Sequence, residues 1–325
     1  MQSLDLDVLQ RALDWKRAGR RVWLVTVAQT FGASPRPPGS LLAIRDDGIL
    51  VGSVSGGCIE DDLVARRDEY SGRKPRFAAY GITSEEARRF GLPCGGQLEV
   101  IIEAEVPPTD LEQLLERITG GHIVARRVDL ASGAWSFAEA RPTDECERGE
   151  RQFTSVHGPR WRMLIIGASE IAIYLAQVAE TLDFKVFVCD PREEYRGAWR
   201  VAGTHWIEGM PDDAVVAFKP DGHSVVLTVS HDPKLDDMAL LEALRSEAFY
   251  VGAVGSKQTS ADRRKRLADF DLTAGQIAKL RGPVGLAIGS RTPPEIALSI
   301  LADLVATRNN NVLEKVEPGT IRRRA

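Results

Sequence analysis

The stretch that decides the fold reads Trp161-Arg162-Met163-Leu164-Ile165-Ile166-Gly167-Ala168-Ser169-Glu170-Ile171-Ala172. It begins with an apolar run typical of a buried strand, turns at Gly167 and continues at helical spacing to Leu182. Further apolar runs at residues 185–189, 224–229 and 248–251 are each followed by a helical stretch. This alternation predicts a doubly wound parallel sheet over residues 161–308, followed by a tail at 309–325.

The residues before this stretch show a different pattern. A helical stripe at 4–18 precedes apolar strand runs at 21–27 and 97–102, and residues 41–54 read as a hairpin with an Asp-Gly turn. This predicts a mixed α+β domain over residues 1–106. The expected fold class is therefore α/β, with an N-terminal mixed α+β domain followed by a Rossmann-like doubly wound parallel-sheet domain.

Residues 107–160 have a less regular pattern. We expect a helix near residues 110–118, one or two strands, and a polar surface loop over 143–151. We therefore interpret this segment as a connecting region with some α/β structure.

The composition excludes several classes of partner. The chain has 325 residues, 43% of them hydrophobic, and a net charge of -4, which gives no indication of nucleic-acid binding. The basic run at 263–266 is interpreted as one solvated helix face. No stretch approaches the roughly 20 apolar residues of a membrane helix.

The acidic start at residues 1–7 does not resemble a signal peptide, so we expect a cytoplasmic protein with reduced thiols. A homodimer is the default oligomer.

The turn at Gly167 occupies the place of a dinucleotide-binding fingerprint. Asp190 follows at about the distance at which an acidic residue meets a ribose hydroxyl. However, Ser169 stands where the second glycine would let the backbone approach a pyrophosphate. Glu170 also adds negative charge at the start of the helix. The pattern therefore favours the fold strongly and NAD(P) binding only weakly.

Polar loops follow several of the predicted parallel strands, at the edge of the sheet where ligands of such folds bind. They offer cations, a histidine and glycine-rich backbone, which suit a phosphate-bearing ligand. For each side chain a structural turn or a solvated charge is the alternative. The candidate residues in these loops are Arg192, His231, Asp232, Gly255, Ser256, Lys257 and Arg291.

Two cysteines stand beside glycine pairs, in Gly56-Gly57-Cys58 and Cys94-Gly95-Gly96. Glycine lets a ligand approach the backbone closely and leaves the sulfur unshielded. A small, inert core cysteine is the alternative at both positions. The start of a helix would favour a thiolate at Cys58, whereas Glu60 and the acidic residues after it oppose one. The chain has no Cys-x-x-Cys pair and no histidine at ligand spacing from a cysteine, so we expect no structural zinc site. Because thiols stay reduced in the cytoplasm, we expect no disulfide either.

Arg36 lies in a proline-rich loop that spans residues 32–39. Proline fixes the backbone angle φ and lowers the entropy of a loop, so this arginine is held in place. A ligand contact and a structural turn remain equal alternatives.

In their order along the chain, these motifs resemble those of the XdhC/CoxI family of bacterial accessory proteins, which mature molybdenum hydroxylases. In the N-terminal half the resemblance rests on Ala33-Ser34-Pro35-Arg36, Gly52-Ser53-Val54-Ser55-Gly56-Gly57-Cys58-Ile59-Glu60 and Gly91-Leu92-Pro93-Cys94-Gly95-Gly96-Gln97-Leu98-Glu99. In the C-terminal half it rests on the Gly167 turn, Asp190, His231-Asp232, Tyr250-Val251-Gly252-Ala253-Val254-Gly255-Ser256 and residues 282–295.

The resemblance implies a maturation factor that binds molybdenum cofactor, as molybdopterin or its dinucleotide form. It implies protection of the cofactor while a cysteine desulfurase exchanges its terminal oxo ligand for sulfur, and delivery into a xanthine dehydrogenase-like apoenzyme. Cys58 and Cys94 would contact molybdenum or the incoming sulfur, and with Glu60 they are the candidate catalytic residues. Arg36, the glycines of both cysteine motifs and the sheet-end loops would hold the rest of the cofactor.

Two other functions stay open. An NAD(P)-dependent oxidoreductase would use the Gly167 turn, and a non-catalytic assembly scaffold would use neither motif. The chain departs from the family pattern at Ser169-Glu170, where Gly-His is frequent, and at Ala287, where aspartate is common. We expect a cofactor chaperone rather than a turnover enzyme.

Overall fold

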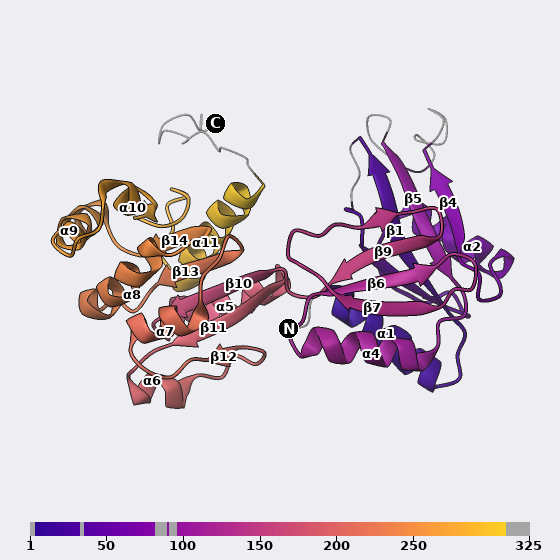
Figure 1. Ribbon diagram of the computed structural model, residues 1–325, viewed down its shortest axis with the longest axis horizontal. Coiled ribbons are helices and arrows are strands. Elements are labelled where there is room, and N and C mark those ends of the chain that lie inside the picture. Colours follow the sequence, from indigo (N-terminus) through magenta and orange to yellow (C-terminus); the bar gives the residue numbers. More distant parts are fainter. Residues whose placement is uncertain (1–3, 33–35, 82–89, 91–95, 310–325) are drawn as a thin grey trace, which may run out of the picture. The chain divides into compact units, whose positions relative to one another are not determined.

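The computed structural model describes residues 4–32, 36–81, 90 and 96–309. The chain divides into two compact units at the junction of Arg160 and Trp161 (Figure 1). The junction is the residue at which strands and helices begin to alternate in the sequence.

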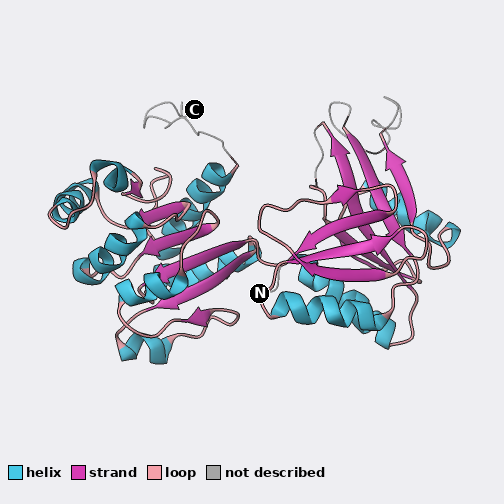
Figure 2. Cartoon of the chain, in the orientation of Figure 1, coloured by secondary structure: helices cyan, strands magenta, loops and turns pink. Residues whose placement is uncertain are grey.

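The C-terminal unit is a six-stranded sheet in the order β12-β11-β10-β13-β14-β15, and every pair of neighbouring strands is parallel (Figure 2). The strands are β10 (Trp161–Ile166), β11 (Phe184–Cys189), β12 (His205–Trp206), β13 (Ser224–Thr228), β14 (Tyr250–Ala253) and β15 (Leu280–Arg281). The helices are α5 (Glu170–Thr181), α6 (Glu193–Ala198), α7 (Pro211–Phe218), α8 (Pro233–Arg245), α9 (Lys257–Ala268), α10 (Ala274–Ala278) and α11 (Pro293–Arg308). The predicted doubly wound parallel sheet is confirmed.

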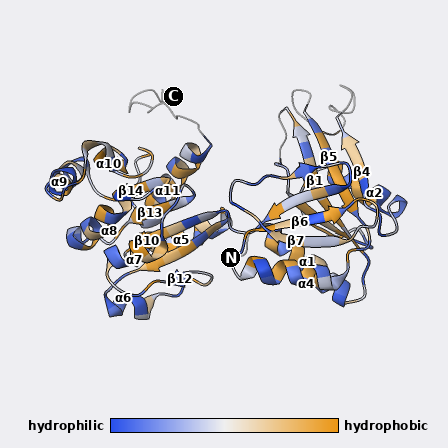
Figure 3. Cartoon of the chain, viewed as in Figure 1, coloured by the Kyte–Doolittle hydropathy of each residue, from blue (hydrophilic) through white to orange (hydrophobic). Residues whose placement is uncertain are grey.

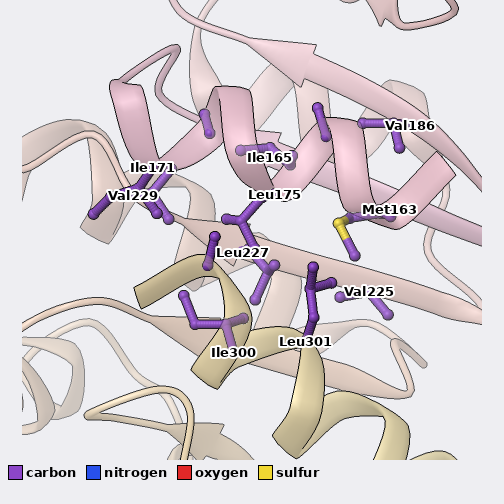
Figure 4. Packing of buried hydrophobic residues seen from close by; sticks show 14 of the residues in the cluster. Met163, Ile165, Ile171, Leu175, Val186, Val225, Leu227, Val229, Ile300 and Leu301 are labelled. Atoms are coloured by element: carbon purple, nitrogen blue, oxygen red, sulfur yellow. The ribbon is translucent and has the colours of Figure 1, made fainter. Parts of the chain in front are cut away.

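Both faces of this sheet are buried, because successive side chains of a strand point to opposite faces. Met163 and Ile165 of β10 pack with α5 and α11 in one core, where Leu175, Ile300 and Leu301 meet the sheet (Figure 4). The alternate residues of β10 pack with α7 and α8 in a second core. Figure 3 shows the resulting contrast between apolar strands β10 and β13 and the polar helix α9.

The N-terminal unit contains two antiparallel sheets. The first has the order β3-β2-β1-β5-β4 and the second the order β7-β6-β9-β8. The strands are β1 (Val22–Phe31), β2 (Leu41–Arg45), β3 (Leu50–Gly52), β4 (Arg76–Tyr80), β5 (Gln97–Glu103), β6 (Val124–Asp129), β7 (Trp135–Glu139), β8 (Glu147–Arg148) and β9 (Gln152–His157). The helices are α1 (Leu4–Arg17), α2 (Cys58–Arg66), the short 3-10 turn η1 (Arg67–Glu69) and α4 (Pro108–Thr119).

The first sheet is covered on both faces. Trp23 and Val25 of β1 pack with Ile59 and Leu63 of α2, whereas Leu24 packs with α1 and α4 on the other face. The mixed α+β character expected for this half of the chain is therefore present, and α2 is one of its two covering layers.

Residues 107–160 belong to the core of the N-terminal unit, which corrects their interpretation as a connecting region. They form α4 and the four strands of the second sheet, where we expected one or two, and the predicted loop over 143–151 contains β8. Arg126 is buried on β6 and donates hydrogen bonds to Glu103 (2.8 Å), Ser155 (3.0 Å) and Thr26 (3.1 Å). The charge of Arg126 made β6 hard to predict from the sequence, because a buried arginine interrupts the apolar pattern that indicates a strand.

Among the described residues, no helix is both long enough and apolar enough to cross a membrane.

Candidate functional site

Strand topology brings the N-terminal motifs to one end of the first sheet. Phe31 at the end of β1 pairs with Gln97 at the start of β5, and Tyr80 at the end of β4 pairs with Leu98. Because neighbouring strands run antiparallel, β2 also begins at this end and β3 finishes there. The loops at 32–40, 53–57 and 81–96 therefore all leave the same end of the sheet. They contain the Arg36, Cys58 and Cys94 motifs.

The Cys58 thiol is exposed at the first residue of α2. The preceding Gly56 has φ +96°, which favours glycine, and a Cβ placed on Gly56 or Gly57 would meet no atom within 4 Å. The inert-core interpretation is therefore wrong for Cys58, because its side chain faces open space.

Glu60 is buried and accepts hydrogen bonds from the whole loop before Cys58. The backbone N–H groups of Val54 (2.8 Å), Ser55 (2.7 Å), Gly56 (3.0 Å) and Gly57 (2.8 Å) all donate to its carboxylate. The hydroxyls of Ser53 (2.7 Å) and Ser55 donate as well. Both oxygens are engaged, so this carboxylate acts as a structural acceptor.

The hydrogen bonds also keep Glu60 ionised. Burial alone would raise the pKa of its carboxyl group, but the donors of Ser55, Ser53 and Gly56 outweigh burial and lower that pKa well below its usual range. A group held ionised in this way is a poor proton donor or acceptor near neutral pH.

Helix α2 is anchored beside the β4–β5 connection. The Tyr80 hydroxyl donates to Asp62 (3.0 Å), and the Tyr80 ring lies 5.1 Å from the Phe90 ring in an edge-on arrangement. Cys94 and Gly95 lie outside the described residues, and Gly96 is buried immediately before β5. The helix that begins at Cys58 is therefore bonded to Tyr80, the last residue of β4, after which the chain continues to Cys94.

The loop with Arg36 returns to the sheet at Gly39, whose N–H donates to the Val27 carbonyl (2.8 Å). A Cβ on Gly39 would lie 2.9 Å from the sulfur of Cys146, so this half-buried thiol packs directly against the loop. Burial raises the pKa of the Cys146 thiol. Sequence reasoning missed this contact, because nothing in the polar neighbourhood of Cys146 indicates it.

In the C-terminal unit, the Gly167 turn is packed tightly against the next loop. Gly167 has φ +96°, and a Cβ there would lie 2.4 Å from the Cα of Ser230. The Ser169 hydroxyl beside it is buried and, within the described residues, has no hydrogen-bond partner. An orphaned hydroxyl at this turn is suited to a ligand that supplies the missing partner.

The carboxylate of Asp190 is bonded to other residues of the same unit. Its buried carboxylate accepts from the Ala168 N–H (2.8 Å) and from the N–H (3.1 Å) and guanidinium (2.7 and 2.8 Å) of Arg192. Burial would raise the pKa of Asp190, but Arg192 and the Ala168 N–H lower it. The group expected to meet a ribose hydroxyl is therefore engaged internally. Arg192 also lies over the Tyr195 ring, 3.8 Å from its centre.

A buried ion pair fixes the next two loops. The Ser230 hydroxyl donates to Asp236 (2.6 Å), which pairs with Arg263 (3.0 Å), and Arg263 donates to the Val254 carbonyl (3.0 Å). The solvated-face interpretation of the basic run is therefore wrong for Arg263. Two other arginines of the run also bind within the chain. Arg264 donates to the carbonyls of Gly282 and Leu280, and Arg266 pairs with Asp237.

The other candidate residues lie where their strands end. His231 is exposed with φ +62°, and the Asp232 carboxylate caps α8 by accepting from the Lys234 N–H (2.9 Å). Ser256 caps α9 in the same way, and the first turn of α9 holds Lys257 and no acidic residue. The parallel strands bring these loops, the Gly167 turn and Gly255 to one edge. Arg291 is exposed before α11, with its N–H bound to Glu295 (2.7 Å).

Within the described part of the chain, no three His, Cys, Asp or Glu side chains are grouped so that they could hold a metal ion.

This chain is similar to known proteins over both of its units. The chain is 26% identical to the molybdenum cofactor insertion chaperone PaoD of Escherichia coli over 93% of its length and 88% of that protein. It is 23% identical to a protein of Bacillus subtilis named as a probable xanthine dehydrogenase subunit, over 88% of this chain and 92% of the relative. The crystal structure of a Bacillus halodurans protein described as a xanthine dehydrogenase has the same fold, with a TM-score of 0.72, 24% identity and 98% coverage of both chains.

Two family descriptions match separate parts of the chain, which together make up more than half of it. Residues 15–80 match the XdhC and CoxI family, and residues 163–304 match the XdhC Rossmann domain. The chain belongs to the XdhC and CoxI family.

Proposed function

We propose that this protein is a maturation factor that binds molybdenum cofactor as cargo and inserts it into a xanthine dehydrogenase-type molybdenum hydroxylase. The name of PaoD, a molybdenum cofactor insertion chaperone, supports a maturation role, and the name of the second relative supports a xanthine dehydrogenase as the enzyme served. In the finer form of the proposal, the protein is a cytoplasmic homodimer. It holds the cofactor while a cysteine desulfurase supplies the sulfur that replaces the terminal oxo ligand.

The observation that carries the proposal is the exposed Cys58 thiol at the end of the sheet from which the Arg36 and Cys94 loops also leave. A thiol is a suitable ligand for a soft metal centre or for transferable sulfur. A Cβ on Gly56 or Gly57 would meet no atom within 4 Å, so a ligand can approach the backbone of this turn closely. Arg36 supplies a cation for the phosphate of the cargo.

The C-terminal unit is proposed to hold the nucleotide or phosphate end of the cargo. The orphaned Ser169 hydroxyl, Arg192 and the start of α9 with Lys257 are the donors available at the sheet edge. The internal engagement of Asp190 counts against the alternative of an NAD-dependent oxidoreductase, because NAD binding in this fold uses a free acidic group for the ribose.

The test is purification of the full chain from a host that makes molybdenum cofactor, followed by metal analysis and pterin fluorescence. We expect about one molybdenum per binding-competent chain, and loss of at least about tenfold in affinity for Cys58→Ala and Cys94→Ala. The matched control is Cys146→Ala, which removes a thiol of the same unit and should retain the cargo. Normal retention by the Cys58→Ala/Cys94→Ala double variant would contradict the thiol contacts.

Two further measurements separate the alternatives. Micromolar binding of NADH or NADPH by fluorescence titration, together with hydride transfer, would favour an oxidoreductase. Stable association with an apo-hydroxylase in the absence of any cofactor binding would favour an assembly scaffold.

A further inference from the structure

We propose that Glu60 is the positioning residue of the N-terminal site, and that its carboxylate sets the place of the Cys58 thiol. The inference rests on the proposed function, in which Cys58 contacts the cargo. Glu60 itself touches no cargo, because both of its oxygens are bonded to the loop at 53–57.

The geometry explains how a residue two positions after the thiol can control it. Four successive N–H groups, from Val54 to Gly57, converge on one carboxylate that belongs to the first turn of α2. Ile59 and Leu63 bury the same helix in the core of the unit. The loop is thereby tied to a fixed helix, and the first residue of that helix is Cys58.

Without this acceptor the loop would have little to hold it. Gly56 and Gly57 meet no neighbouring atoms where a side chain would be, and glycine has the largest backbone freedom of all residues. Hydrogen bonds to an ionised carboxylate are about twice as strong as bonds between neutral groups. The carboxylate therefore selects one loop conformation among many.

The hydrogen bonds to Glu60 also determine which groups of the loop are available to a ligand. The loop's N–H groups point at Glu60, so they are not available to an anionic cargo, although a glycine-rich loop before a helix is a common anion site. This loop therefore offers the cargo the exposed thiol that follows it rather than its own N–H groups. Arg36 is a cation on another loop that leaves the same end of the sheet.

The experiment compares Glu60→Gln with Asp61→Asn in the full chain, purified from a host that makes molybdenum cofactor. Asp61 is the matched control because it is adjacent, exposed and carries the same charge. Molybdenum content and pterin fluorescence give the affinity, which we expect to fall about 10–100-fold for Glu60→Gln. For Asp61→Asn it should stay within about twofold. Unchanged binding by a folded Glu60→Gln variant would overturn the inference.

Ser55→Ala gives a second variant in case Glu60→Gln does not fold. It keeps the carboxylate and its charge and removes one hydroxyl donor. We expect a loss of affinity of about tenfold, in line with the low end of one hydrogen bond to a charged group. Binding equal to that of the unaltered protein would count against the positioning role.

A double variant separates positioning of the thiol from general support of the fold. If Glu60 acts through Cys58, then Cys58→Ser/Glu60→Gln should bind no more weakly than Cys58→Ser alone. Losses that multiply would overturn the inference and leave the proposed function intact. Equal binding by the unaltered protein and Cys58→Ser would instead contradict the thiol contact itself, and with it the role of Glu60.

Discussion

The two glycine-rich turns of this protein hold the same chemical group in the same kind of place. In the N-terminal unit the turn at Gly56 encloses the carboxylate of Glu60, and in the C-terminal unit the turn at Gly167 binds the carboxylate of Asp190. Each carboxylate accepts backbone N–H groups that sequence reasoning would offer to an anionic ligand. Both turns are therefore filled, at least in part, from within the chain.

The turns differ in where the carboxylate comes from and in what else it binds. Glu60 lies four residues from Gly56 and is surrounded by neutral donors. Asp190 comes directly after the neighbouring strand β11, 22 residues from Ala168, and forms an ion pair with Arg192. The Gly56 turn is held by local hydrogen bonds and is followed by the exposed thiol of Cys58. The Gly167 turn is held by a contact between the ends of two strands, and the guanidinium of Arg192 there remains partly exposed to solvent.

The largest expected effect distinguishes the two glycines themselves. Both have φ +96°, but a Cβ at Gly56 meets nothing, whereas a Cβ at Gly167 lies 2.4 Å from backbone of Ser230. We expect Gly56→Ala to cost about 1–2 kcal/mol from backbone strain. Gly167→Ala should cost about 4 kcal/mol or more, because the clash with fixed backbone is added.

Hydrogen exchange followed by mass spectrometry in denaturant measures these losses, since it reports on each unit separately. Each variant serves as the control of the other, because the conformational strain is shared and only the packing differs. Equal losses would mean that Ser230 yields to the added methyl group.

The same contrast shows how far the sequence could predict the molecule. Alternating strands and helices after Trp161 predict the parallel sheet, because its strands are mainly apolar and the first turn is marked by Gly167. The second sheet was missed because Arg126 interrupts the pattern of β6. Only the fold reveals that its charge is compensated by Glu103, which precedes it by 23 residues.

The site was predictable in its location and less so in its chemistry. Glycine pairs, Cys58 and the sheet-end loops could be picked out as unusual, and strand topology then placed them at two edges. Three contacts depended on residues distant in sequence or on side-chain direction, and these could not be read from a pattern. They are the Asp190 bond to Ala168, the contact of Gly39 with Cys146, and the inward direction of Glu60.

The second effect concerns the contribution of Glu60 to stability. Glu60→Gln should lower the free energy of unfolding of the N-terminal unit by about 3 kcal/mol at neutral pH, because four N–H groups and two hydroxyls lose a charged, buried acceptor. The pKa of Glu60 is lowered in the folded protein, so the unfolded chain takes up the proton first as the pH falls.

This linkage fixes the pH range of the test. The stability from the ionised carboxylate is complete above the unfolded pKa of about 4.3 and is lost as the pH falls below it toward the lowered folded pKa. The difference between the unaltered protein and Glu60→Gln should therefore shrink below about pH 4.3 in chemical unfolding experiments. The exposed Asp61→Asn variant should stay within about 0.5 kcal/mol throughout. A difference that is independent of pH would show that the charge of Glu60 is unimportant.

The smallest effect separates the two carboxylates by the kind of partner. Asp190→Asn keeps an oxygen for the Ala168 N–H but loses the ion pair with Arg192, whose side chain is 27% exposed and can be solvated by water. We expect a loss of about 1–2 kcal/mol in the C-terminal unit, from hydrogen bonds to a charged group that are partly replaced by water.

Salt then provides the comparison between the turns. At about 1 M salt the screening length falls to about 3 Å, so the partly exposed ion pair is weakened and the loss caused by Asp190→Asn should fall by about half. The loss caused by Glu60→Gln should change little, because the donors to this buried carboxylate are uncharged. Unfolding of both variants in low and high salt, each against the unaltered protein, measures the two dependences. If both losses fell equally with salt, Arg192 would not be what distinguishes the Gly167 turn, and the two turns would be electrostatically alike.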